Sequence, residues 1–143
     1  MQSVRLDQFD VIIWDFDGVI LDSAEVRDHG FLEIFSNYPE HQVSQLMDFH
    51  KSNGGLSRYV KIRHFFEEIL MTSVTEDQVN YYANEFKQIM LSKLTDRDLI
   101  INDSLAFIKE NHQKQKFYIA SGSDEKELNI ICSKWDWLIF LLR

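Results

Sequence analysis

The sequence has little of several features that would place it in a special class of protein. It holds one cysteine in 143 residues, Cys132, so no internal disulfide can form and a reducing compartment is favoured. The N-terminal stretch MQSVRLDQFD lacks the apolar core of a secretory signal peptide, and we expect a cytoplasmic location. The apolar run from Trp137 to Leu142 is far too short to span a bilayer. There is no internal repeat and no low-complexity tract.

Positive charge is also scarce. The 15 lysines and arginines face 23 aspartates and glutamates, which gives a formal net charge of −8 at pH 7. This balance opposes binding to nucleic acid or to an anionic membrane surface, and we expect neither as a partner. With 45% hydrophobic and 27% charged residues, the composition predicts a soluble globular domain of ordinary size.

Two short apolar segments are predicted to be strands of a parallel sheet. Phe9 to Trp14 and Lys116 to Ala120 (KFYIA) are rich in β-branched and aromatic residues and contain neither glycine nor proline. Such runs indicate strands that are buried on both faces. Helical patterns follow them, from Ser23 and from Asp124. Two strand-to-helix units indicate an α/β fold.

An all-helical stretch separates the two units. The expected helices run from Ser23 to the break at Pro39, over His41–His50, over Ser57–Met71, from the capping-box start at Thr75, and over Asn102–Gln113. The apolar residues expected in the core of this stretch are Tyr59, Ile62, Phe65, Phe66, Ile69, Leu70, Tyr81, Tyr82 and Phe86. The sequence thus predicts an α/β unit over residues 1–23 and 97–143, with an all-helical block inserted over residues 24–96.

Two carboxylates one residue apart, Asp15 and Asp17, end the first strand. Carboxylates at the end of a buried segment repel each other and are costly to desolvate, so a function is needed to explain them. Ligand sites of parallel sheets lie at the carboxyl ends of the strands, where Ser121 to Ser123 follow the second strand. Two carboxylates without a nearby histidine or cysteine suit Mg²⁺ better than Zn²⁺, and Gly18 permits close approach of a ligand. Taken alone, the first pair could be a solvated strand end and the second segment a plain helix N-cap.

Together these motifs resemble the haloacid dehalogenase (HAD) superfamily. DFDGVI (15–20) matches its first motif, Asp-x-Asp-x-[Thr/Val]-[Leu/Ile], and LDS (21–23) follows as in the phosphoglycolate phosphatase and β-phosphoglucomutase branch. The resemblance implies that Asp15 is the nucleophile that becomes an aspartyl-phosphate and that Asp17 is the general acid/base. It also implies that an Asp15 carboxylate oxygen and the Asp17 carbonyl hold Mg²⁺. The α/β unit and the all-helical block resemble an incomplete Rossmann-like core and the inserted helical cap domain of this family.

The second family motif is similar to FYIASGS (117–123). The resemblance implies that Ser121 binds the transferring phosphoryl group, with Gly122, Gly18 and the backbone N–H groups of the turn completing the anion site. In the helical stretch, GLSR (55–58) resembles the cap loop that carries an arginine towards the substrate, which makes Arg58 a substrate contact. Lys61 and Arg63 are further cations nearby. The five histidines show no metal-binding spacing and are interpreted as surface or helix-face residues: His29, His41, His50, His64 and His112.

The family also uses a lysine in a third motif and acids in a fourth motif, and this sequence ends at Arg143 without them. Lys126 and Lys134 follow Ser121 too soon to be matched to the third motif. The leading hypothesis is therefore a Mg²⁺-dependent phosphatase-type hydrolase of small phosphorylated metabolites. We expect it in a truncated or frame-disrupted form, or as a fragment of a longer protein, with little or no turnover. The alternatives are a catalytically inactive binding or interaction protein, a sugar-phosphate mutase and a phosphoacceptor of the response-regulator kind. The sequence does not specify the substrate or the oligomeric state.

Overall fold

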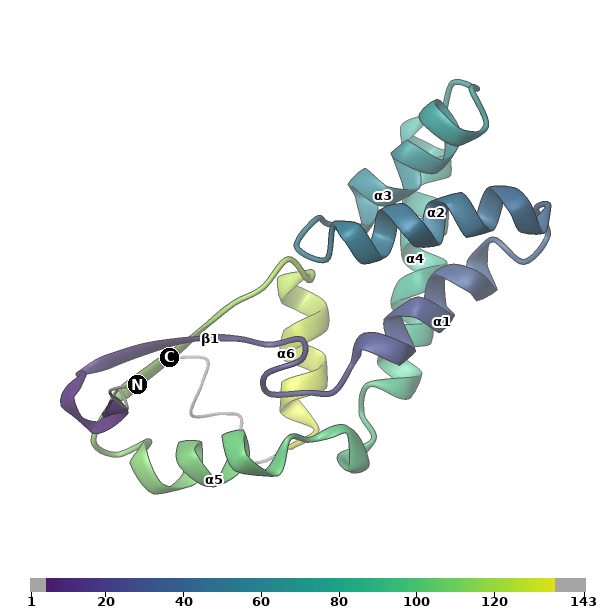
Figure 1. Ribbon diagram of the computed structural model, residues 1–143. Helices are drawn as coiled ribbons and strands as arrows, with labels where there is room; N and C mark the ends of the chain where they lie inside the picture. Colours follow the sequence, from purple (N-terminus) through teal and green to yellow (C-terminus); the bar gives the residue numbers. More distant parts are fainter. Residues whose placement is uncertain (1–4, 136–143) are drawn as a thin grey trace.

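The structure is a computed structural model, and it describes residues 5–135. The elements run in the order η1 (Leu6–Gln8), β1 (Val11–Asp15), α1 (Ala24–Ile34), α2 (Glu40–Ser52), α3 (Arg58–His64), η2 (Phe65–Ile69), α4 (Glu76–Lys93), η3 (Arg97–Leu99), α5 (Asn102–Asn111), β2 (Lys116–Ala120) and α6 (Glu125–Ser133). The two strands, α5 and α6 lie towards one end of the molecule, and α2 and α3 lie at the other (Figure 1). The predicted α/β fold, a partial sheet core with a helical insertion, is confirmed. The apolar run from Trp137 to Leu142 lies outside the described residues.

The sheet has two parallel strands, with Val11 opposite Lys116 and Asp15 opposite Ala120. On one face Trp14 packs edge-on against Phe117, with ring centroids 5.9 Å apart, and against Phe107 of α5 at 5.8 Å. These rings exclude water from that face and hold the two strands together.

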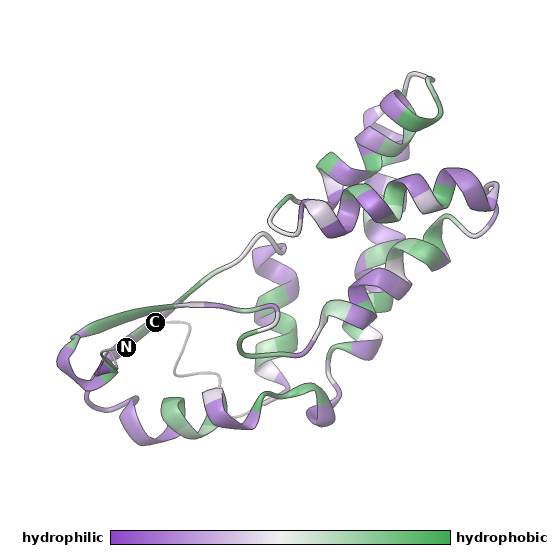
Figure 2. Ribbon diagram, in the orientation of Figure 1, coloured by the Kyte–Doolittle hydropathy of each residue, from purple (hydrophilic) through white to green (hydrophobic). Residues whose placement is uncertain are grey.

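The prediction that the strands are buried on both faces is wrong. Val11, Ile13 and Tyr118 point to the second face and are exposed, Ile13 by 66%. In the described residues α5 supplies aromatic packing to the first face only, so the second keeps its apolar side chains in water. Figure 2 shows β1 as a hydrophobic ribbon despite this exposure. β1 also begins at Val11, two residues later than expected.

Aromatic side chains form the core of the helical block α1–α4. Phe31 of α1 packs on Phe86 of α4 at 4.6 Å, and Phe35 packs on Phe65 at 4.2 Å and on Tyr82 at 4.9 Å. The residues predicted for this core are buried or half-buried, with two exceptions. Tyr59 and Tyr81 are exposed, because each points away from the neighbouring helices into solvent.

The helix predicted over residues 57–71 is interrupted. Its α-helical part ends at His64, and a π-helical turn follows in which the Leu70 N–H donates to the Phe65 carbonyl at 2.9 Å. The wider turn leaves both Phe65 and Phe66 buried. The chain then reverses at Met71, whose φ is +52°. The predicted capping box at the start of α4 is present: the Thr75 side chain accepts from Gln78 N–H, and the Gln78 side chain accepts from Thr75 N–H.

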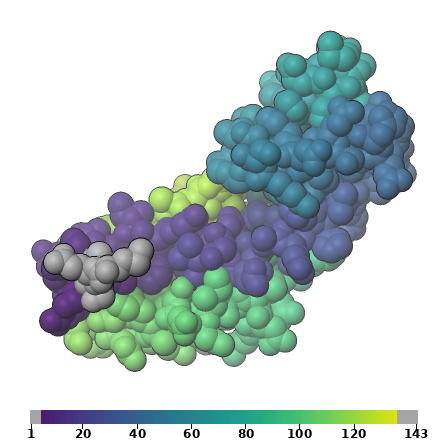
Figure 3. Space-filling view, viewed as in Figure 1, coloured from purple at the N-terminus to yellow at the C-terminus, as the bar shows by residue number. Residues whose placement is uncertain are grey.

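The helical block is joined to the core by ion pairs and by packing of α4 on α6. The carboxylate of Glu127 in α6 is fully buried and lies 2.5 Å from Nη2 of Arg58 and 3.9 Å from Nη1 of Arg27. Figure 3 shows the blue and teal helical block over the end of the purple and green core. The domain boundaries predicted from the sequence stay a prediction. In residues 5–135, no helix combines the length and apolar character needed to cross a membrane.

Gly30 is buried where α1 crosses α4, and we expect Gly30→Ala to destabilise the fold. A Cβ there would lie 2.8 Å from the Phe86 ring and 2.7 Å from Met90 Cε. Overpacking costs more than alanine gains in helix propensity, so the free energy of unfolding should fall by about 1 kcal/mol in urea denaturation. The control is Gly54→Ala, whose Cβ would meet nothing within 4 Å and should change stability by less than about 0.5 kcal/mol. A more stable Gly30→Ala chain would contradict this packing.

Replacing one partner of the Arg58–Glu127 pair should destabilise the fold more than replacing both. Arg58→Met leaves a buried carboxylate with one distant arginine, and we expect a loss of about 3 kcal/mol in urea denaturation. The double variant Arg58→Met/Glu127→Leu removes both charges and should recover most of that loss. Additive losses in the double variant would show that the two side chains act independently.

Candidate functional site

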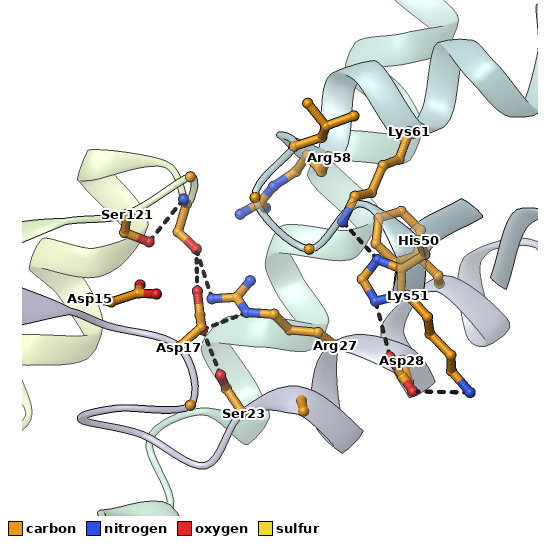
Figure 4. A pocket seen from close by; sticks show the side chains of 18 of the residues that line it. Asp15, Asp17, Ser23, Arg27, Asp28, His50, Lys51, Arg58, Lys61 and Ser121 are labelled. Carbon is orange, nitrogen blue, oxygen red and sulfur yellow. Dashed lines mark hydrogen bonds and ion pairs between the residues drawn. The ribbon is translucent and has the colours of Figure 1, made fainter. Parts of the chain in front are cut away.

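A cavity of about 1140 Å³ lies between the carboxyl ends of the strands and the helical block. Its walls include every site residue predicted from the sequence: Asp15, Asp17, Gly18, Arg58, Ser121 and Gly122. Figure 4 shows Asp15, Asp17 and Ser121 on the core side, with Arg58, Lys61 and His50 across from them. Residues that are about a hundred positions apart in the chain therefore share one cavity.

Asp15 and Ser121 leave the sheet side by side, because Asp15 pairs in register with Ala120. The Asp15 side chain is exposed to the cavity. Within residues 5–135 its carboxylate has no hydrogen-bond or ion-pair partner. An unpaired carboxylate at a strand end keeps its lone pairs available to a cation or an electrophile.

Asp17 is held by three donors. The Ser23 hydroxyl donates to Oδ1 at 2.5 Å, Arg27 Nε donates to the same oxygen at 2.7 Å, and the Ser123 hydroxyl donates to Oδ2 at 3.2 Å. Arg27 Nη2 also donates to Ser123 at 2.8 Å, which closes a ring of contacts. These donors fix the orientation of the Asp17 carboxyl group beside Asp15.

Two glycines shape the turns around the carboxylates. Gly18 has φ +75°, a left-handed conformation that glycine adopts without strain, and its N–H donates to the Leu21 carbonyl at 2.7 Å. At Gly122 a Cβ would lie 2.8 Å from the Gly55 carbonyl oxygen. The loop that precedes α3 therefore rests directly on the turn after β2, and a side chain at position 122 would push it away.

Arg58 lines the cavity, but its charge is already paired. Its side chain is buried, lies over the Phe86 ring at 4.9 Å and forms the ion pair with Glu127. Burial raises the pKa of Glu127, and the nearby Arg58 opposes that shift. Arg63, the other arginine near the predicted cap loop, pairs with Glu76 instead and does not line the cavity.

The cap wall of the cavity carries a chain of polar contacts that the sequence did not indicate. Asp28 Oδ1 lies 3.0 Å from His50 Nε2, and His50 Nδ1 lies 2.8 Å from Lys61 Nζ. Lys51 reaches the other oxygen of Asp28 at 3.7 Å. Of the two interpretations of His50, surface or helix-face residue, the first is wrong: the ring lies on the inner face of α2, buried against Phe31 with centroids 4.7 Å apart.

Several residues of the site were missed because their partners are distant in sequence. Arg27 follows Ser23 by four positions, so both side chains share one face of α1, and that spacing was an available signal. Glu127 stands three residues after the N-cap Asp124, a position typical of a capping residue, yet its side chain turns inward. No pattern in the sequence indicated the His50–Lys61 contact.

The described residues offer few ligands for a metal. No group of three or more His, Cys, Asp or Glu side chains that could hold an ion occurs within residues 5–135. Asp15 and Asp17 are the carboxylates on the core side of the cavity. Oxygen ligands in this number suit Mg²⁺, which is commonly bound by one or two carboxylates together with water and substrate phosphate.

No protein-family model and no curated protein matches the sequence. Among solved structures, the chain is similar to YfnB of Bacillus subtilis, described as a HAD-hydrolase in a crystal structure with bound magnesium. The TM-score is 0.64 at 12% sequence identity, and the match covers 93% of this chain and 62% of that chain. At this identity the likeness shows the fold alone. The chain therefore shares its fold with YfnB and spans a little under two thirds of that protein's length.

Proposed function

We propose that this chain carries the site of a Mg²⁺-dependent phosphatase-type hydrolase that acts on a small phosphorylated metabolite. The observation that carries the proposal is the contrast between the two carboxylates. Asp15 is free of partners and faces the cavity, whereas Asp17 beside it is fixed by three donors. A nucleophile must be free, and a general acid/base must be oriented. The fold likeness to a HAD-hydrolase and the matched motifs support the same assignment.

The residues present fit a weakly held Mg²⁺. The Asp15 carboxylate is unpaired, and the chemistry of the donor set is oxygen only. Asp15 and the backbone carbonyl of Asp17 would hold the ion, with water and the phosphate of the substrate as further ligands. When bound, Mg²⁺ supplies positive charge against the negative charge that gathers at the phosphoryl group.

The reaction proceeds in two halves on the chain's own residues. The Asp15 carboxylate forms a bond to phosphorus, the bond from phosphorus to the leaving oxygen breaks, and that oxygen takes a proton from the protonated form of Asp17. Water then gives a proton to Asp17 and attacks phosphorus, which releases inorganic phosphate and regenerates Asp15. Ser121 donates to the phosphoryl oxygens, and Arg27 holds Asp17 in place through both halves.

Electrostatics explains why this site needs an added cation. The repulsion between the Asp15 carboxylate and a phosphate about 4 Å away costs on the order of 4 kcal/mol for each pair of unit charges at an effective dielectric of 20. Arg27, the arginine that contacts Asp17, is already paired with it.

We also propose the cap boundaries 24–96 and a cytoplasmic location. The mutual packing of α1–α4 and the single buried thiol of Cys132 support them, respectively.

Phosphate release from p-nitrophenyl phosphate tests the proposal. We expect slow Mg²⁺-dependent release by the 143-residue chain, and Asp15→Asn should abolish it, because the nucleophile is lost. Asp17→Asn should lower turnover to a similar degree, because an amide cannot carry the proton.

The matched control is Asp22→Asn, which removes an exposed carboxylate of the same loop that does not line the cavity. Its turnover should equal that of the parent chain. Release no greater than that of Asp15→Asn, from a chain shown to be folded by circular dichroism, contradicts the proposed function.

A further inference from the structure

The cavity is polarised, with an unpaired carboxylate, Asp15, on one side and a lysine that forms no direct ion pair within residues 5–135, Lys61, on the other. Figure 4 shows Asp15 and Lys61 on opposite sides of the cavity. Most other charged groups around it are paired: Asp17 with Arg27, Arg58 with Glu127, and Asp28 with Lys51. Within residues 5–135, Lys61 forms no ion pair, and its polar contact is the ring of His50.

His50 cannot act as a counter-charge for Lys61. The carboxylate of Asp28 only accepts hydrogen bonds, so His50 Nε2 carries the proton that points to it. Burial and the charge of Lys61 lower the pKa of His50, which leaves the ring neutral at pH 7. His50 Nδ1 is then an acceptor that takes one N–H of the Lys61 ammonium. The other two N–H groups remain for a ligand.

Holding Lys61 in this place costs stability. The residue is 3% exposed, and burial lowers the pKa of its ammonium, which is the sign of a charge that lacks solvation. The Phe31 ring, with its centroid 5.8 Å from Nζ, offsets only part of that loss. An apolar side chain would suit this wall of the cavity better if the lysine served the fold alone.

We propose that Lys61 binds a second anionic group of the substrate, a carboxylate or a phosphate at the end remote from the phosphoryl group that Asp15 attacks. The proposal rests on the proposed function. It assigns this contact to Lys61 and not to Arg58, whose charge Glu127 neutralises. The cavity of about 1140 Å³ has room for a substrate that carries both groups. The chain is thus selective for phosphoesters with two anionic ends.

Equilibrium binding to the Asp15→Asn chain in the presence of Mg²⁺ tests this selectivity without turnover. Calorimetry compares 3-phosphoglycerate with glycerol 3-phosphate, which differ by a carboxylate in place of a hydroxymethyl group, and fructose 1,6-bisphosphate with fructose 6-phosphate. In at least one pair, we expect the compound with two anionic groups to bind at least about tenfold more tightly than the compound with one. The pair that shows the preference distinguishes a carboxylate from a phosphate.

Adding Lys61→Met to this chain should bring the ratio of the two dissociation constants within the pair to about one. The control Lys126→Met removes an exposed lysine outside the cavity and should leave that ratio unchanged. The double variant Arg58→Met/Glu127→Leu should keep it as well. Without ligand, Lys61→Met should raise the melting temperature by about 2 °C or more, because a buried uncompensated charge is removed.

Four results overturn the inference. Equal binding within both pairs refutes it while the proposed function stands, and so does a preference that disappears with Arg58→Met/Glu127→Leu but survives Lys61→Met. A lower melting temperature for Lys61→Met assigns the lysine a structural role. If none of the four phosphoesters binds, the inference fails, and p-nitrophenyl phosphate release decides separately whether the proposed function stands.

Discussion

The carboxylate of Asp17 is the contact on which the arrangement of the site depends. It joins three segments: the turn after β1, the start of α1 through Ser23 and Arg27, and the turn after β2 through Ser123. Ser123 is 106 positions away in the chain. Because each donor loses its acceptor if Asp17 moves, the three segments can shift only together. A single carboxylate thus fixes both the geometry of the cavity and the position of α1 against the core.

Charge around the cavity is distributed unevenly, and the distribution matches the chemistry proposed for it. The core contributes Asp15, Asp17 and Glu127, and the helical block answers with two arginines, which pair with Asp17 and Glu127. The unpaired Asp15 opposes an incoming phosphate unless a divalent cation is bound. On the cap side, Lys61 contributes a charge that forms no direct ion pair within residues 5–135. The proposed substrate with two anionic ends would therefore need Mg²⁺ at the end near Asp15, whereas Lys61 would supply the positive charge at the other end.

The sequence predicted the local features of this fold and missed the contacts made across it. β2 occupies Lys116–Ala120 as predicted, and the Thr75 capping box is present, because each is set by neighbouring residues. The carboxylates and Ser121 were placed together because strand ends of a parallel sheet meet at one edge. The π-helical turn at Phe65–Ile69 and the burial of His50 depend on packing between helices, which periodicity does not encode. The exposed face of β1 was mispredicted because a run of apolar residues does not reveal whether a second layer covers it.

The Arg58–Glu127 pair bears on how firmly the helical block is held against the core. The loop before α3 rests on Gly122, and Arg58 of α3 reaches Glu127 of α6, so any opening of the cavity at this point separates the pair. Separation loses a close ionic contact, but it also returns a fully buried carboxylate to water. Because burial already raises the pKa of Glu127, the gain in solvation offsets much of the lost attraction. The pair thus fixes the position of α3 against α6, and its separation costs less free energy than the close ionic contact alone would suggest.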